Sequence, residues 1–110
     1  MSGLLGKKIT TGATLEIARV PNAITYAAIN ILISNPSSVA TPEANGVEIF
    51  IADAGSAPGT VDLVEPGAII PAKGKLEWNC RLVSPGEVIY VRAPSGYVVR
   101  VESADEIEAV

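Results

Sequence analysis

The chain has 110 residues, no histidine and one cysteine, and its eight basic and twelve acidic residues give a net charge of −4. The absence of histidine removes the usual general base and the commonest metal ligand, and a single cysteine excludes an internal disulfide. Because the only basic cluster is Lys7-Lys8, we expect no nucleic-acid binding. This length fits one domain.

Hydrophobic residues make up 48% of the chain, but aromatic residues only 5% and charged residues 18%. The β-branched share favours strands, and a surface so poor in charge predicts that another chain covers part of it. The longest apolar stretch, residues 27–33, is interrupted by Asn30 and is far shorter than the roughly 20 residues of a membrane helix. We expect no membrane span. The N-terminus does not resemble a signal peptide, which predicts synthesis in a cytoplasm.

In chain order, the first half of the sequence predicts an arm, two strands and a loop. Residues 1–12 are rich in glycine and unpatterned, so we expect an N-terminal arm that is ordered only when a partner binds it. Residues 13–20 and 23–34 are predicted strands, and the second has two apolar faces, as central strands do. A polar loop with two prolines follows at residues 35–45, and loops of that length are often contact segments.

The second half is divided by Pro/Gly turns into short strands. Residues 47–52 alternate in hydrophobicity, and residues 61–64 and 68–70 are predicted edge strands because prolines flank them. Three further strands are expected at residues 75–83, 87–93 and 97–103. We expect them to pair with one another as a meander.

The strand over residues 75–83 alternates most regularly. The alternation predicts an inner row of Leu76, Trp78, Cys80 and Leu82, with Glu77, Asn79 and Arg81 on the other side. The chain then ends in residues 104–110, which we expect to be a frayed acidic tail, with a short helix as the alternative. As a whole, the pattern predicts a single antiparallel β-sandwich, jelly-roll-like, of seven or eight strands over residues 13–103.

No motif indicates catalysis. Cys80 lies in an apolar row and is expected to be a buried small hydrophobe, and without histidine a nucleophile would need a Ser-x-x-Lys spacing that does not occur. Asp53 and Asp62 flank a Gly-rich loop but lack the alternating ligands of a calcium site. The few aromatic residues offer little ring surface on which a sugar could stack. We therefore expect no enzyme, no catalytic residue, no cofactor and no metal.

Four segments together carry a resemblance to a known family: residues 29–35, 47–51, 69–78 and 82–92. They include a Pro71–Leu76 turn before one strand and a Pro-Gly-Glu-Val-Ile run, Pro85–Ile89, before the next. In this combination, residues 20–103 resemble the small β-sandwich structural proteins of tailed bacteriophages. The chain departs from that pattern at residues 19–22, where the approach to the first long strand is usually rich in glycine.

The resemblance implies a non-enzymatic virion protein that is made in the host cytoplasm and assembles symmetrically, and we expect a homotrimer that binds the major capsid protein or other virion proteins. We predict a capsid decoration (cement) protein that stabilises the shell, because the chain has no coiled coil or shaft repeat from which to form a fibre. The alternatives are a tail, baseplate or fibre-associated component, a carbohydrate-binding β-sandwich module, and a cellular adaptor.

Unpatterned segments on a rigid sandwich are where contacts concentrate, so the arm and the polar loop are the predicted contact regions. We also expect deletion of residues 1–8 to leave the fold intact and to weaken attachment to the particle. The predicted partner-contact residues are Leu4, Leu5, Lys7, Lys8, Asn35, Pro36, Pro42 and Asn45.

Overall fold

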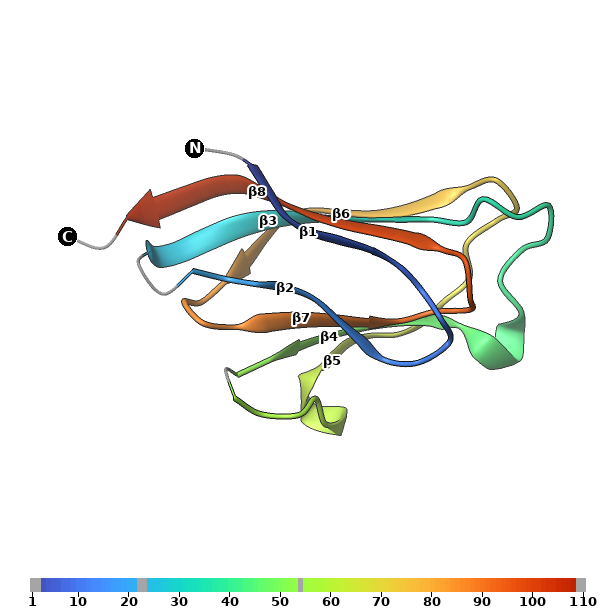
Figure 1. Ribbon diagram of the computed structural model, residues 1–110, viewed down its shortest axis with the longest axis horizontal. Coiled ribbons are helices and arrows are strands. Elements are labelled where there is room, and N and C mark those ends of the chain that lie inside the picture. Colours follow the sequence, from blue (N-terminus) through green and yellow to red (C-terminus); the bar gives the residue numbers. More distant parts are fainter. Residues whose placement is uncertain (1–2, 22–23, 54, 109–110) are drawn as a thin grey trace.

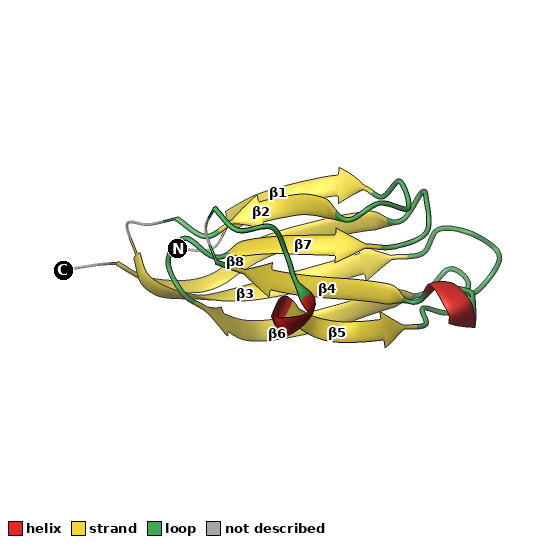
Figure 2. Cartoon of the chain, turned by 90° about the horizontal axis from the view of Figure 1, so that it is seen from below, coloured by secondary structure: helices red, strands yellow, loops and turns green. Residues whose placement is uncertain are grey.

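A computed structural model describes residues 3–21, 24–53 and 55–108; for residues 24–27, 80, 82 and 104–108 it describes the backbone only. Over this part of the chain, eight strands form two four-stranded antiparallel sheets that face each other (Figures 1 and 2), which confirms the expected all-β sandwich. The strands are β1 (Gly3–Ile9), β2 (Leu15–Arg19), β3 (Ile24–Ser34), β4 (Val47–Ala52), β5 (Leu63–Ala68), β6 (Lys75–Val83), β7 (Val88–Arg92) and β8 (Val98–Glu108). Two single-turn 3-10 helices, η1 (Glu43–Asn45) and η2 (Thr60–Asp62), precede β4 and β5.

The strand order is that of an eight-stranded jelly roll. One sheet, the β1 sheet, has the order β1-β8-β3-β6, and the other, the β2 sheet, has the order β2-β7-β4-β5. Each strand therefore pairs with its counterpart from the opposite end of the chain: β1 with β8, β2 with β7, β3 with β6 and β4 with β5. The chain is one long folded ribbon wrapped around a core, which is the jelly-roll arrangement.

The predicted meander of the last three strands is wrong. Strands β6 and β8 belong to the β1 sheet and β7 belongs to the β2 sheet, so each connection crosses from one layer to the other. Local alternation and turns show where strands begin and end. They do not determine which sheet a strand joins, because that depends on pairing with residues far away in the sequence.

Branched aliphatic side chains from both sheets fill the core. Ile29, Ile31 and Ile33 of β3 are almost fully buried, and they pack in one cluster with residues of the facing β2 sheet. Burial of each such side chain contributes roughly 1.5–3 kcal/mol. The facing residues include Val47 and Ile49 of β4 and Ile89 and Val91 of β7.

A β-bulge changes the phase of alternation within β6. Ile31 pairs with Trp78 and Ile29 pairs with Arg81, so an extra residue of β6 stands between these two pairs. After the bulge it is Val83 that is buried.

The predicted inner row is therefore right for Leu76 and Trp78, which pack partly buried against the core, and wrong as one continuous face. The side chains of Cys80 and Leu82 lie outside the described residues. The exposed guanidinium carbon of Arg81 lies 5.7 Å from the centre of the Trp78 ring, so Arg81 is not on the face away from Trp78 that alternation predicted.

Residues 1–2 of the predicted N-terminal arm (residues 1–12) lie outside the described residues, and residues 3–9 form strand β1. It pairs with β8 from Ser103 to Val98, with a bulge at Leu5 that interrupts the alternation the sequence would otherwise show. A glycine is required at position 6 of this strand, because a Cβ there would lie 2.0 Å from the carbonyl oxygen of Ile17 in β2. The glycine permits close contact between strands and does not make the segment an arm.

Two further expectations are corrected. The frayed tail or helix was predicted over residues 104–110, but residues 104–108 continue β8 and pair with β3 as far as Ile24, and residues 109–110 lie outside the described residues. In place of two short strands at residues 61–64 and 68–70, the chain forms η2 and a single edge strand, β5, which passes through Pro66. Proline is tolerated there because an edge strand needs ladder hydrogen bonds on one side only.

Candidate interaction surface

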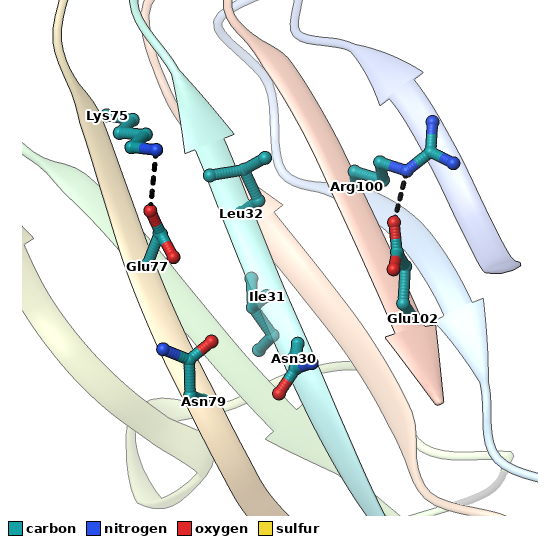
Figure 3. Close-up of a pocket in the computed structure, with 8 residues that line it drawn as sticks. All are labelled: Asn30, Ile31, Leu32, Lys75, Glu77, Asn79, Arg100 and Glu102. Carbon is teal, nitrogen blue, oxygen red and sulfur yellow. Dashed lines mark hydrogen bonds and ion pairs between the residues drawn. The ribbon is translucent and has the colours of Figure 1, made fainter. Parts of the chain in front are cut away.

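The outer face of the β1 sheet is built by cross-strand register. Leu32 of β3 lies between Arg100 of β8 and Glu77 of β6, and Asn30 of β3 stands opposite Glu102 of β8. Residues directly opposite one another share a face of a sheet, so these side chains form two rows across the surface. They line a shallow hollow of about 210 Å³ (Figure 3).

Two ion pairs border this hollow. The Lys75 Nζ lies 2.8 Å from Glu77 Oε1 along β6, and the Arg100 Nε lies 2.5 Å from Glu102 Oε1 along β8 (Figure 3). The hydrogen bond from Lys75 lowers the pKa of Glu77, and the same bond raises the pKa of Lys75. Each of these charges lies beside an opposite charge on the same strand, so the hollow is a polar surface with paired charges at its border.

An apolar patch adjoins the hollow at the edge of the sheet. Ile9 of β1 pairs with Val98 of β8, and their side chains are 65% and 42% exposed. Together with Lys7 and Lys8 they line an apolar hollow of about 330 Å³, and Leu4, 46% exposed, lies further along β1. We call Leu4, Lys7, Lys8, Ile9 and Val98 the β1 patch. Exposed apolar surface with a polar rim is typical of interaction sites.

Among the predicted contact residues of the N-terminal segment, Leu4, Lys7 and Lys8 lie in the β1 patch. Leu5 is different, since it packs partly buried against the core. The sequence did not identify Ile9 or Val98. Their proximity depends on the pairing of β1 with β8, which joins opposite ends of the chain.

Asn35 of the polar loop is an internal structural residue. Its side chain is 1% exposed, and its Nδ2 donates to the carbonyl oxygens of Val39 (2.9 Å), Ile70 (3.2 Å) and Pro71 (3.3 Å). Its Oδ1 accepts from the backbone N–H (3.0 Å) and the hydroxyl (2.8 Å) of Ser37. Its side chain therefore orders the loop and is not presented to a partner, contrary to its predicted role.

The other predicted loop residues, Pro36, Pro42 and Asn45, are exposed, and a contact at these positions stays a prediction. The carbonyl of Pro36 accepts a hydrogen bond from Lys73 Nζ (2.8 Å), and Asn45 Oδ1 accepts one from Arg92 Nη1 (2.8 Å). These bonds tie the loop to the sandwich, so the loop presents a fixed shape.

A second set of buried polar side chains lies at the end of the sandwich that holds Asn35. The hydroxyls of Thr41 and Tyr97 lie 2.7 Å apart, and Thr41 Oγ1 also accepts from the backbone N–H of Ile70 (3.1 Å). Thr10 Oγ1 accepts from the backbone N–H of Tyr97 (2.9 Å) and donates to the carbonyl of Pro94. The loops at this end are thus held by bonds within the chain.

Within the described residues, no group of three or more His, Cys, Asp or Glu side chains could hold a metal ion. In that same part of the chain, no helix is long and apolar enough to cross a membrane.

No protein-family model matches the chain, and no curated protein matches it. Among solved structures, the chain is similar to one in the structure titled "Cyanophage Pam1 capsid asymmetric unit", with 16% sequence identity, 93% of this chain and 81% of that chain covered, and a TM-score of 0.38.

Proposed function

We propose that this protein is a non-enzymatic structural subunit of a tailed-phage virion, a capsid decoration protein that attaches to the shell through the β1 patch. The class of protein rests on the resemblance of residues 20–103 to phage structural proteins. The jelly-roll order is compatible with that class but is shared with lectins and cupins, so it does not decide the function.

The observation that carries an assembly role is the β1 patch itself. Ile9 and Val98 expose adjoining apolar side chains on two paired strands of a rigid sheet, with lysines at the rim. A partner that covers this patch would gain the apolar area, at roughly 25 cal/mol per Å² removed from water. The major capsid protein is the proposed partner on the particle.

The carbohydrate-binding alternative is weaker on this surface. Sugar platforms need exposed aromatic rings. Tyr97 is buried, Trp78 packs against the core, and Phe50 and Tyr90 are half-buried. Among the described side chains, none provides a fully exposed aromatic ring.

The test is attachment to capsids that were assembled without this protein, measured by co-sedimentation. We expect the wild type to bind saturably and Ile9→Glu to lose binding, because the substitution places a charge in the apolar contact. Val61→Glu is the matched control: Val61 is 95% exposed on η2, away from the β1 sheet, and this variant should bind as the wild type does.

Electron microscopy of labelled protein then distinguishes the positions on the particle. Label over the shell supports decoration, and label restricted to the tail supports the tail-associated alternative. Saturable binding by Ile9→Glu at the wild-type level would contradict attachment through the β1 patch. Deletion of residues 1–8 would not test attachment alone, because it removes most of strand β1 and uncovers β8.

A further inference from the structure

Two cations lie side by side on the outer face of the β1 sheet. Lys7 of β1 is the register partner of Arg100 of β8, and both side chains are exposed. Residues directly opposite one another in an antiparallel pair have Cβ atoms about 4.5–5.5 Å apart, and like charges at such positions destabilise the sheet. We call Lys7 and Arg100 the cation pair. An anion bound between the two side chains would offset their repulsion.

The cation pair carries positive charge that the described chain does not neutralise. Arg100 donates its Nε to Glu102 (2.5 Å), and in Figure 3 its guanidinium extends from β8 toward β1. Among the described residues, no ion pair reaches Lys7. The cation pair and the polar hollow beside it together have three basic and two acidic side chains, an excess of one positive charge on a chain whose net charge is −4. Such a surface favours an acidic partner.

Apolar surface adjoins the cation pair on the same two strands. Ile9 lies two residues along β1 from Lys7, and its register partner is Val98, so alternation places these side chains on the face of the cation pair. Ile9 and Val98 are exposed and line the apolar hollow of about 330 Å³ with the two lysines of the β1 patch. The surface therefore has a cationic half and an apolar half. A complementary partner presents a carboxylate with an apolar side chain beside it.

We infer that the β1 patch recognises an acidic segment of the major capsid protein, which places a carboxylate against the cation pair and an apolar side chain over Ile9 and Val98. This inference rests on the proposed function and deepens it by naming the chemistry of the capsid surface that is bound. A carboxylate between Lys7 and Arg100 replaces one like-charge contact by two charge-assisted contacts. Electrostatic complementarity of this kind contributes specificity and a faster association rate, while the apolar contact contributes affinity.

The variant Lys7→Glu separates binding from folding. It turns the like-charge cross-strand pair into an opposite-charge pair, so the thermal midpoint of the free chain should rise by roughly 1–4 °C. The same variant should bind capsids at least about tenfold more weakly in co-sedimentation, because an acidic partner then meets a negative charge. Lys7→Arg, which keeps the charge, should lose far less binding. A variant that is more stable and yet binds more weakly cannot owe its loss of binding to unfolding.

The matched control is Lys73→Glu, which makes the same change of charge in the turn before β6 and should leave binding unchanged. The capsid is tested by converting its carboxylates to amides with a carbodiimide and glycinamide. Shells that stay intact in electron micrographs should then bind the wild type at least about tenfold more weakly. Acetylation of capsid lysines should not weaken binding. Binding to untreated capsids should also weaken between roughly 0.05 and 0.5 M salt, because screening reduces the attraction.

Three results would overturn the inference: Lys7→Glu that binds as the wild type does, Lys7→Glu and Lys73→Glu that weaken binding equally, or intact amidated shells that bind undiminished. Each would leave the proposed function standing as long as the wild type binds and Ile9→Glu does not. A wild type that binds no capsid would contradict both the proposed function and the acidic contact.

Discussion

The two ends of the sandwich are built in different ways. At the loop end, the buried side chains of Asn35 and Thr41 bond to carbonyls and amides of the connecting segments. At the opposite end, β3 and β8 continue as a pair after the described part of β1 has ended, and charged residues follow one another in β8. The comparison teaches that one sandwich can fix its connections by buried hydrogen bonds at one end and extend a single strand pair past the other strands at the opposite end.

The largest effect is expected from Asn35→Ala. The substitution removes the buried amide that donates to the carbonyls of Val39, Ile70 and Pro71 and accepts from Ser37, and it frees the loop, so the free energy of unfolding should fall by about 3 kcal/mol. Asn45→Ala is the matched control, because Asn45 is exposed, and it should cost less than about 0.5 kcal/mol. Urea unfolding measures both. A loss below about 1 kcal/mol for Asn35→Ala would mean that water replaces its bonds.

A somewhat smaller effect is expected from Gly6→Ala. The new methyl group would collide with the carbonyl of Ile17, so β1 must move away from β2, at a cost of about 2 kcal/mol. Gly59→Ala, with its nearest neighbouring atom at 3.9 Å, is the control and should be close to neutral. Equal unfolding midpoints for the two variants would show that β1 does not pack as described.

Tyr97→Phe isolates one hydrogen bond of the loop end. It removes the hydroxyl that lies 2.7 Å from Thr41 Oγ1 while keeping the ring, so we expect a loss of about 1 kcal/mol in denaturant unfolding. Tyr90→Phe, at a half-buried tyrosine of β7, is the comparison and should change stability less. The reverse ranking would argue against the buried network as a source of stability.

The smallest effect concerns the exposed pair of Lys75 and Glu77. Because the folded-state pKa of Glu77 is lowered, the pair stabilises the fold above the unfolded-state pKa, and this contribution is lost as the pH falls below about 4.3. The unfolding midpoints of wild type and Glu77→Gln should differ slightly at pH 7 and converge at pH 3. A difference between the two unfolding midpoints that grows as the pH falls would mean that the pKa of Glu77 is not lowered in the folded state.

The sequence predicts a strand well when the residues that mark it are neighbours in the chain, and poorly when the strand depends on contacts with distant residues. The strand Lys75–Val83 was predicted to the residue because its ends are marked by Pro/Gly turns. Strand β1 was missed because the bulge at Leu5 breaks its alternation, and its glycine serves a close contact with β2 that lies outside the local pattern. The extension of β8 was missed because a run of carboxylates is uncommon within a strand.

The candidate surface was predicted only in part, for a related reason. Leu4, Lys7 and Lys8 were identified because they stand in an unpatterned N-terminal segment, which can be recognised from neighbouring residues alone. Ile9 and Val98 form a patch only because the two ends of the chain pair, and pairing over that separation has no local signal. Asn35 was predicted as a contact residue because it begins an unpatterned polar loop, whereas its amide is buried and makes five hydrogen bonds within the chain.

Amide hydrogen exchange, compared between the free chain and the chain attached to capsids, tests the contrast between the loop end and strand β1 most directly. We expect residues 35–41 to be protected in the free chain and unchanged on attachment. Strand β1, which has a partner strand on one side only, should exchange faster than those residues in the free chain and become protected when the chain attaches to capsids. A β1 strand whose protection does not change on attachment would contradict the account.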